Sequence, residues 1–189
     1  MSSVPKAVAH PPLVKAEALL GPAYDGPHEL WDGHVVVREA CGFDADSVAA
    51  RVASILLVHS DRHGLGRVTG SSAGFVLARD PDRLLVPDAA FVARERSRIV
   101  TPGRLAEGSP DLAVEVRSPS DSWISVVRKA GLWLAHGTRV VWAIDPEARR
   151  VVVFRGLDEP VTLGPRDLLD GAPVLPKLRF RVDRLFRGW

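Results

Sequence analysis

Two carboxylates interrupt apolar stretches of this sequence. Glu115 stands between two valines, and Asp88 follows a proline inside the apolar stretch 84–92. A carboxylate in such a place destabilises the fold unless it is protonated, paired with a cation or bound to a metal. The small neighbours Ala90 and Ala113 leave room beside these carboxylates for an ion or a substrate. Both residues are therefore candidates for chemistry.

The residue types leave two explanations of these carboxylates open. If the two lie close together, their repulsion raises the pKa of one of them, and a hard divalent cation relieves it. Alternatively the carboxylates are structural and form salt bridges with Arg117 or Arg128. Residue types and spacing alone favour the salt bridges.

Other kinds of site have less support. The single cysteine, Cys41, excludes a disulfide within the chain and a metal site built from cysteines. The histidines show no metal-ligand spacing, since His59 and His63 straddle the predicted end of a helix, so we do not expect zinc. Asp111 shares the strand face of Glu115 but lies about 13 Å away along the strand, outside the predicted site.

Composition and charge set the class of protein. The chain has 189 residues, 46% of them hydrophobic and 25% charged, as in one ordinary soluble domain. The net charge of +2 is too small to indicate nucleic-acid binding by itself, and we expect the arginine-rich stretches 94–104 and 179–187 to be solvated. No apolar run approaches the roughly 18 residues of a membrane span, and a secretory signal is not evident. We expect a cytoplasmic protein without a membrane partner.

The first half of the chain predicts hairpins and one helix. Residues 28–38 form a hairpin that turns at Asp32-Gly33, a pair suited to positive φ angles. A helix capped by Asp46 or Ser47 runs to about residue 62 and ends before Gly64. A second hairpin spans 67–79, a strand spans 84–92, and a loop of roughly 18 residues follows.

The second half predicts a parallel crossover. A strand over 111–117 leads, after Ser118-Pro119-Ser120, into a helix that runs to Ala135, and a strand over 139–144 follows. Further strands span 150–154 and 178–183. With a short helix at 13–20, the chain divides into a loose tail, 1–12, and one domain, 13–189. The fold class is mixed α/β.

The order of these pieces resembles the PD-(D/E)XK nuclease superfamily. More specifically, the chain resembles the Uma-two family of restriction endonucleases over about residues 13–186. The motifs that carry this resemblance are HELWDG at 28–33, VPDAAFV at 86–92, PDLAVEVRSPSD at 110–121, RKAGLWLAHG at 128–137, VVWAIDP at 140–146 and the segment from GAPVLP at 171–176 to Leu185-Phe186. The resemblance implies a restriction-endonuclease-like fold: a mixed central sheet flanked by helices, with an N-terminal hairpin.

The resemblance also assigns roles to residues. Asp88 matches the metal-binding aspartate, Glu115 matches the acidic residue of the (D/E)XK element, and Glu29 is a candidate third carboxylate. The chain departs from the superfamily at Arg117, where the usual residue is lysine. Arg117 is either a phosphate contact or a salt-bridge partner.

In Uma-two proteins the lysine has moved to the following helix, where Lys129 stands in this chain. Helical geometry places Lys129 roughly 120° from the centre of the predicted buried stripe, which is a flank. A flanking lysine is ordinarily solvated, but its side chain can reach back toward Glu115. The predicted stripe consists of Trp123, Val126, Val127, Ala130 and Leu134.

The resemblance implies an endonuclease that hydrolyses DNA phosphodiester bonds with Mg²⁺ or Mn²⁺. Its partners are then DNA and a second copy of the chain, since such enzymes often act as symmetric dimers. The alternative is a catalytically inactive nuclease fold that serves nucleic-acid binding or assembly. A glycoside hydrolase with paired carboxylates is a weaker possibility, because no aromatic platform accompanies the carboxylates.

Overall fold

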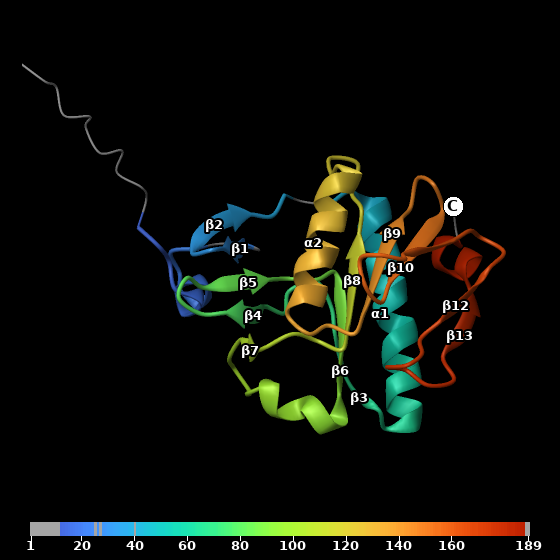
Figure 1. The fold of residues 1–189 in the computed structure, drawn as a ribbon, viewed down its shortest axis with the longest axis horizontal. Helices are drawn as coiled ribbons and strands as arrows, with labels where there is room; N and C mark the ends of the chain where they lie inside the picture. Colours follow the sequence, from blue (N-terminus) through green and yellow to red (C-terminus); the bar gives the residue numbers. More distant parts are fainter. Residues whose placement is uncertain (1–11, 25, 27, 40, 188–189) are drawn as a thin grey trace, which may run out of the picture.

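The computed structural model describes residues 12–24, 26, 28–39 and 41–187, so the predicted tail falls almost entirely outside the described residues. Two larger sheets, a two-stranded ribbon and two α-helices make up the fold (Figure 1). The six-stranded sheet has the order β11-β10-β9-β8-β6-β3, the five-stranded sheet has the order β2-β1-β5-β4-β7, and β12 and β13 form a separate ribbon. The predicted mixed sheet flanked by helices, with an N-terminal hairpin, is confirmed.

The helices and strands have the following bounds. The helices are α1 (Phe43–His63) and α2 (Trp123–Ala135), with 3-10 turns at Ala16–Leu20, Arg94–Ile99 and Val182–Phe186. The strands are β1 (His28–Trp31), β2 (His34–Val37), β3 (Gly66–Thr69), β4 (Phe75–Ala78), β5 (Arg83–Leu85), β6 (Ala89–Ala93), β7 (Ala106–Glu107), β8 (Leu112–Val116), β9 (Val140–Asp145), β10 (Arg150–Phe154), β11 (Val161–Leu163), β12 (Leu168–Asp170) and β13 (Arg179–Arg181).

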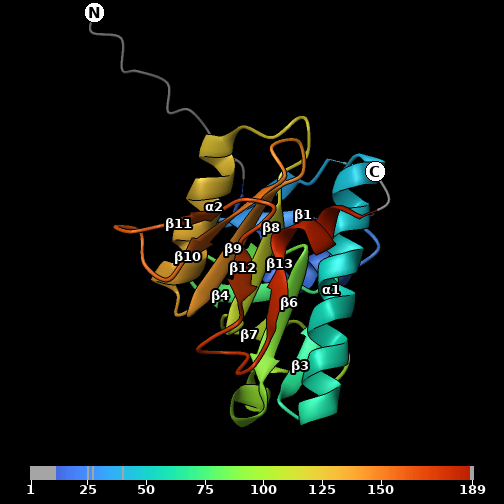
Figure 2. The same ribbon diagram turned by 90° about the vertical axis from the view of Figure 1, so that its right-hand side faces the viewer.

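The two helices cover opposite faces of the six-stranded sheet (Figure 2). Side chains alternate along each strand, so Val114 and its equivalents pack under α1 while Ala113 and its equivalents face α2. The α2 layer also contains Phe75 and Leu85 from the five-stranded sheet. As a result, α2 packs where the two sheets meet.

Several predicted elements are confirmed. β1 and β2 form an antiparallel hairpin in which Asp32 and Gly33 have φ of 53° and 79°. β8 and β9 pair in parallel on either side of α2 in the chain. On β13, buried Phe180 lies between two exposed arginines, as the alternation in the sequence predicts.

The predicted helix boundaries need correction. α1 begins at Phe43 after Gly42, so neither Asp46 nor Ser47 is its cap, although Gly64 ends it in the left-handed conformation with φ of 62°. α2 begins at Trp123, and its cap is Ser122, whose side chain accepts a hydrogen bond from the Ser125 amide. The segment before it is a turn, because Ser118 donates to the Asp121 carboxylate at 2.7 Å.

The predicted hairpin at 67–79 is wrong. β3 pairs with β6 and β4 pairs with β5, so the two strands belong to different sheets. Gly66 permits the close approach of β3 to β6, since a Cβ there would lie 2.1 Å from the Val92 carbonyl oxygen. The pairing is therefore decided by contacts between segments distant in the sequence.

The strand predicted at 84–92 is two strands in two sheets. β5 ends at Leu85 and β6 begins at Ala89. The Val86 amide donates to the Glu29 carboxylate at 3.1 Å, and Pro87 has no N–H to donate to a neighbouring strand. The chain leaves one sheet there and enters the other. The loop predicted between 93 and 110 contains a 3-10 turn and β7.

None of the helices within the described residues combines the length and the apolar character that a membrane span requires.

Candidate active site

Glu115 lies on the face of β8 that is turned toward α2. Its side chain is buried, and each of its oxygens has a polar partner. The Lys129 Nζ lies 2.7 Å from Oε2, and the Trp133 Nε1 donates to Oε1 at 2.7 Å. Both partners come from α2, so the crossover helix holds this carboxylate in place.

Lys129 borders the buried face of α2: its side chain is 16% exposed, and it reaches back to Glu115 as predicted. The buried residues of this helix are Val126, Ala130 and Trp133. Lys129 comes three residues after Val126 and four residues before Trp133, so it neighbours both on the helix surface. Trp123 and Leu134, which define part of the predicted stripe, are only partly buried. Trp133 belongs to the buried stripe instead, and it contacts Glu115.

Glu29 on β1 is the second carboxylate that contacts Lys129. Its Oε1 lies 3.0 Å from the Lys129 Nζ and also accepts the Val86 amide, while its Oε2 accepts a hydrogen bond from Trp31 at 3.1 Å. Lys129 also donates to the Val86 carbonyl at 3.4 Å. Glu29 thereby joins the five-stranded sheet to the site on the other sheet.

Asp88 lies at the break between β5 and β6. Its Oδ2 accepts the Val116 amide at 2.6 Å, which fixes it beside the end of β8. Its Oδ1 lies 2.7 Å from a guanidinium nitrogen of Arg38, and Arg38 also donates to the Ser71 carbonyl at 3.1 Å. Asp88, Glu115, Glu29 and Lys129 all line one cavity of about 350 Å³.

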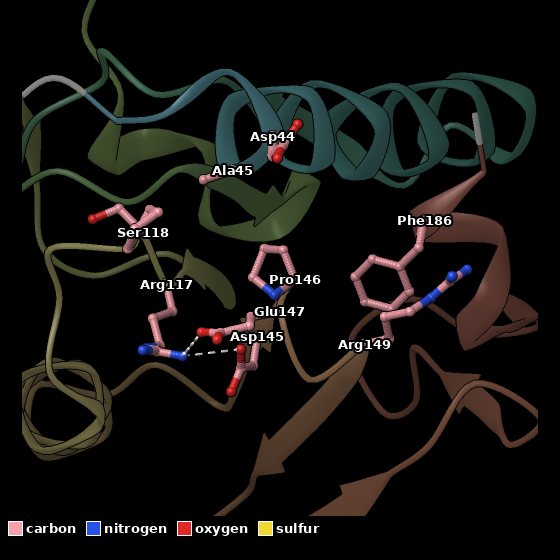
Figure 3. Close-up of a pocket in the computed structure, with 10 residues that line it drawn as sticks. Asp44, Ala45, Arg117, Ser118, Asp145, Pro146, Glu147, Arg149 and Phe186 are labelled. Atoms are coloured by element: carbon pink, nitrogen blue, oxygen red, sulfur yellow. Dashed lines mark hydrogen bonds and ion pairs between the residues drawn. The ribbon is translucent and has the colours of Figure 1, made fainter. Parts of the chain in front are cut away.

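The cations predicted to pair with the carboxylates have other partners. Arg117 lies 3.2 Å from both Asp145 and Glu147, and the three side chains line a neighbouring pocket (Figure 3). The Arg128 guanidinium carbon lies 4.4 Å from the centre of the Trp31 ring. The salt bridges are formed by Lys129 and Arg38 instead.

The charges of the cavity shift the pKa values of two groups. Burial raises the pKa of Glu115 to about 7, because Asp88 and Glu29 add to the burial effect and Lys129 only partly offsets it. Burial lowers the pKa of Lys129, but Glu115 and Glu29 outweigh it, and the pKa is raised above its ordinary value. Lys129 is therefore an ammonium at neutral pH.

The donor chemistry fits a hard divalent cation. Five carboxylates line the cavity with only two cationic side chains, and carboxylate oxygens are the ligands that Mg²⁺ prefers. Of these carboxylates, Glu39 and Asp121 are exposed. Asp88 and Glu115 are the residues that could hold such an ion. Among the described residues, however, no three histidine, cysteine or acidic side chains converge as a metal cluster. Lys129 and Arg38 already contact the oxygens of Glu115 and Asp88.

Two residues of the site were missed by the sequence analysis. Trp133 was not singled out, although its spacing of four from Lys129 could have placed it on the same helix face. Arg38 is one of many arginines and carried no local signal. Arg38 is identified as a residue of the site only by its contact with Asp88 in the structure.

The two-sheet fold places this protein in the restriction-endonuclease-like fold class. Residues 18–183 match the model of the Uma2 family, described as "Putative restriction endonuclease". The chain belongs to the Uma2 family. This membership supports a nuclease function, and with it a hydrolase acting on nucleic acids.

A solved structure shows the same fold. A crystal structure from Anabaena variabilis, described as "a putative nuclease belonging to DUF820", superimposes with a TM-score of 0.79 at 22% sequence identity, covering 93% of this chain and 98% of the other. At this identity the likeness concerns the fold alone. The comparison with curated proteins found no match.

Proposed function

We propose that this protein is a Mg²⁺- or Mn²⁺-dependent endonuclease that hydrolyses DNA phosphodiester bonds. The observation that supports this most strongly is the direct contact of Lys129 with Glu115, in a cavity that also contains Asp88. Membership of the Uma2 family supports a nucleic-acid substrate.

Asp88 and Glu115 would hold the divalent cation through their carboxylate oxygens. A cation bound there would supply charge neutralisation at the phosphate and a water nucleophile of lowered pKa. Glu115 must be ionised to serve, and its raised pKa places that ionisation near neutral pH. The Val116 amide keeps Asp88 oriented beside the end of β8.

Lys129 would stabilise the negative charge that develops on the phosphate oxygens. Glu115 and Glu29 keep its amine protonated and hold it at 2.7 and 3.0 Å. On these contacts Glu29 acts mainly by positioning Lys129, and any role as a third metal ligand requires it to release that contact. Lys129 takes the role that the superfamily gives to the lysine at the position of Arg117.

We propose that Arg117 ties the ends of β8 and β9 together instead of contacting the phosphate. Its guanidinium is engaged by Asp145 and Glu147 and donates to the Asp121 carbonyl at 3.2 Å. A homodimer remains part of the proposal, because cutting both strands of a duplex suits a symmetric pair of sites. Light scattering of the purified chain measures this directly.

The second candidate is a catalytically inactive nuclease fold that binds nucleic acid or serves assembly. One observation favours it: each oxygen of Asp88 already has a protein partner. A metal must displace Arg38 or share Asp88 with it.

The test is cleavage of supercoiled and linear DNA with Mg²⁺ or Mn²⁺, with a chelator in parallel. Lys129→Met removes the proposed catalytic charge, and Lys177→Met removes an exposed lysine outside the cavity as a matched control. We expect metal-dependent nicking by the natural chain and by Lys177→Met but not by Lys129→Met. Absence of cleavage by a folded, metal-binding protein would favour the inactive candidate.

A further inference from the structure

Arg38 is a positively charged side chain in direct contact with a proposed metal ligand. It follows β2, its side chain is 20% exposed, and one guanidinium nitrogen lies 2.7 Å from the Asp88 Oδ1. The guanidinium contributes another hydrogen bond to the Ser71 carbonyl. It therefore contacts the Asp88 oxygen that faces away from the Val116 amide.

Three of the five carboxylates that line the cavity act on Arg38. Burial lowers the pKa of Arg38, but Asp88, Glu115 and Glu29 together outweigh burial and raise it. Asp88, Glu115 and Glu29 share the two positive charges of Arg38 and Lys129, and exposed Glu39 and Asp121 also line the cavity. The lining therefore has more acidic than basic side chains. A divalent cation in the place of Arg38 would bring one more positive charge to these carboxylates, and Arg38 competes with it for Asp88.

The residues next to Arg38 contribute little to the core, although Val35 earlier in β2 packs against it. β2 is at the edge of its sheet and pairs only with β1 among the described strands. Val37 beside Arg38 is 66% exposed, and Val36 is 41% exposed. The contacts that hold the guanidinium are therefore those to Asp88 and Ser71, which are polar and replaceable by water or by another ligand.

We propose that Arg38 is the resident counter-ion of the unloaded site: a divalent cation displaces its guanidinium from Asp88, and the released guanidinium then contacts a phosphate of the bound DNA. This inference rests on the proposed function. A guanidinium pairs with a phosphate through two parallel hydrogen bonds, and its release would occur beside the reacting phosphate. Arg38 thereby links metal binding to substrate binding.

The experiment is a calorimetric titration of Mg²⁺ and Mn²⁺ into the natural chain, Arg38→Met, Arg38→Gln and Arg38→Lys. Arg83→Met is the matched control, because Arg83 is 22% exposed and pairs with Asp32, yet it does not line the cavity. Circular dichroism checks that each variant folds, and DNA cleavage at saturating metal gives KM and kcat.

We expect Arg38→Met and Arg38→Gln to bind the metal about tenfold more tightly or better, since a cation within a few ångströms is gone. Arg38→Lys and Arg83→Met keep the natural affinity. At saturating metal the two neutral variants show a raised KM for DNA, partly restored by Arg38→Lys.

Unchanged or weaker metal binding by both neutral variants would overturn this inference, even if the natural chain cleaves DNA. Tighter metal binding without any cleavage by the natural chain would instead overturn the proposed function and leave the counter-ion role standing. If none of the proteins binds a metal, both fail.

Discussion

Two pockets lie at the same end of β8 and β9, and they differ in how their charges are matched. One is the cavity of Glu115, Asp88 and Lys129, and the other is the pocket of Arg117, Asp145 and Glu147 (Figure 3). Ser118 lines both. The second pocket is the larger, at about 630 Å³ against about 350 Å³.

In the larger pocket the charges are satisfied without a ligand. Asp145 is paired with Arg117 and Arg150 and accepts the Ala148 amide, and Glu147 is 82% exposed, so water screens it. In the smaller cavity Glu115 and Glu29 are buried and share one cationic partner, Lys129. The excess of buried negative charge, more than the volume of the pocket, identifies the candidate active site.

The largest effect should come from Lys129→Met. Removing the ammonium withdraws the charge stabilisation proposed for the reacting phosphate, so we expect cleavage to fall by about 100-fold or more. The measurement is the initial rate of plasmid nicking at saturating Mg²⁺. A residual rate within a few-fold of the natural chain would show that the charges of this cavity do not serve catalysis.

Metal binding should depend on pH. The pKa of Glu115 is raised to about 7, and the cation requires the ionised form, so metal affinity should fall about tenfold for each pH unit below 7. Glu115 also makes the unloaded protein more stable at low pH. Its pKa is higher folded than unfolded, so this contribution to the free energy of unfolding is lost as the pH rises toward 7. Calorimetry at several pH values checks the affinity, and a flat profile between pH 5 and 8 would contradict the assignment.

Two buried tryptophans lie on opposite faces of the six-stranded sheet and differ in their hydrogen bonds. Trp133 donates to Glu115, whereas the indole nitrogen of buried Trp142, under α1, has no hydrogen-bond partner among the described residues. Trp133→Phe should therefore raise the pKa of Glu115. It should also lower the free energy of unfolding by about 1.5 to 3 kcal/mol when Glu115 is ionised, because a hydrogen bond to a charged group is lost.

Trp142→Phe is the control for that substitution. It removes the same ring area without removing a hydrogen bond, so it should change the denaturation midpoint but leave the pH profile of metal binding unmoved. Equal pH profiles for the two variants would show that the indole of Trp133 does not act on Glu115.

The smallest effect should come from Arg117→Gln. The pairs of Arg117 are partly exposed, so its loss should change the free energy of unfolding by about 1 kcal/mol and cleavage by only a few-fold. Urea denaturation and the nicking assay measure both. A loss as large as that of Lys129→Met would mean that Arg117 contacts the phosphate after all.

Local patterns in the sequence predicted the elements that bear the site but not their contacts. The Asp32-Gly33 turn, β8 and the crossover to β9 follow from turn chemistry and alternation. The change of sheet at Pro87 does not, since it depends on Glu29 accepting the Val86 amide from a distant strand.

The same limit applies to the site residues. Glu115 and Asp88 stood out because each is a charge among apolar neighbours. The contact of Lys129 with Glu115 and Glu29 required the correct choice of buried stripe on α2, and Arg38 required the three-dimensional contact with Asp88. The family resemblance predicted the role of Lys129, whereas neither the resemblance nor the periodicity predicted that Arg38 belongs to the site.

The most direct test of the central claim is calorimetric titration of Mg²⁺ and Mn²⁺ into the metal-stripped protein, alongside Asp88→Asn and Glu115→Gln. Both substitutions keep the shape of the side chain, so the folds should be retained. We predict saturable binding by the natural chain that each substitution abolishes. Absence of saturable binding, or binding that survives both substitutions in folded proteins, would contradict the assignment of this cavity as a metal-dependent active site.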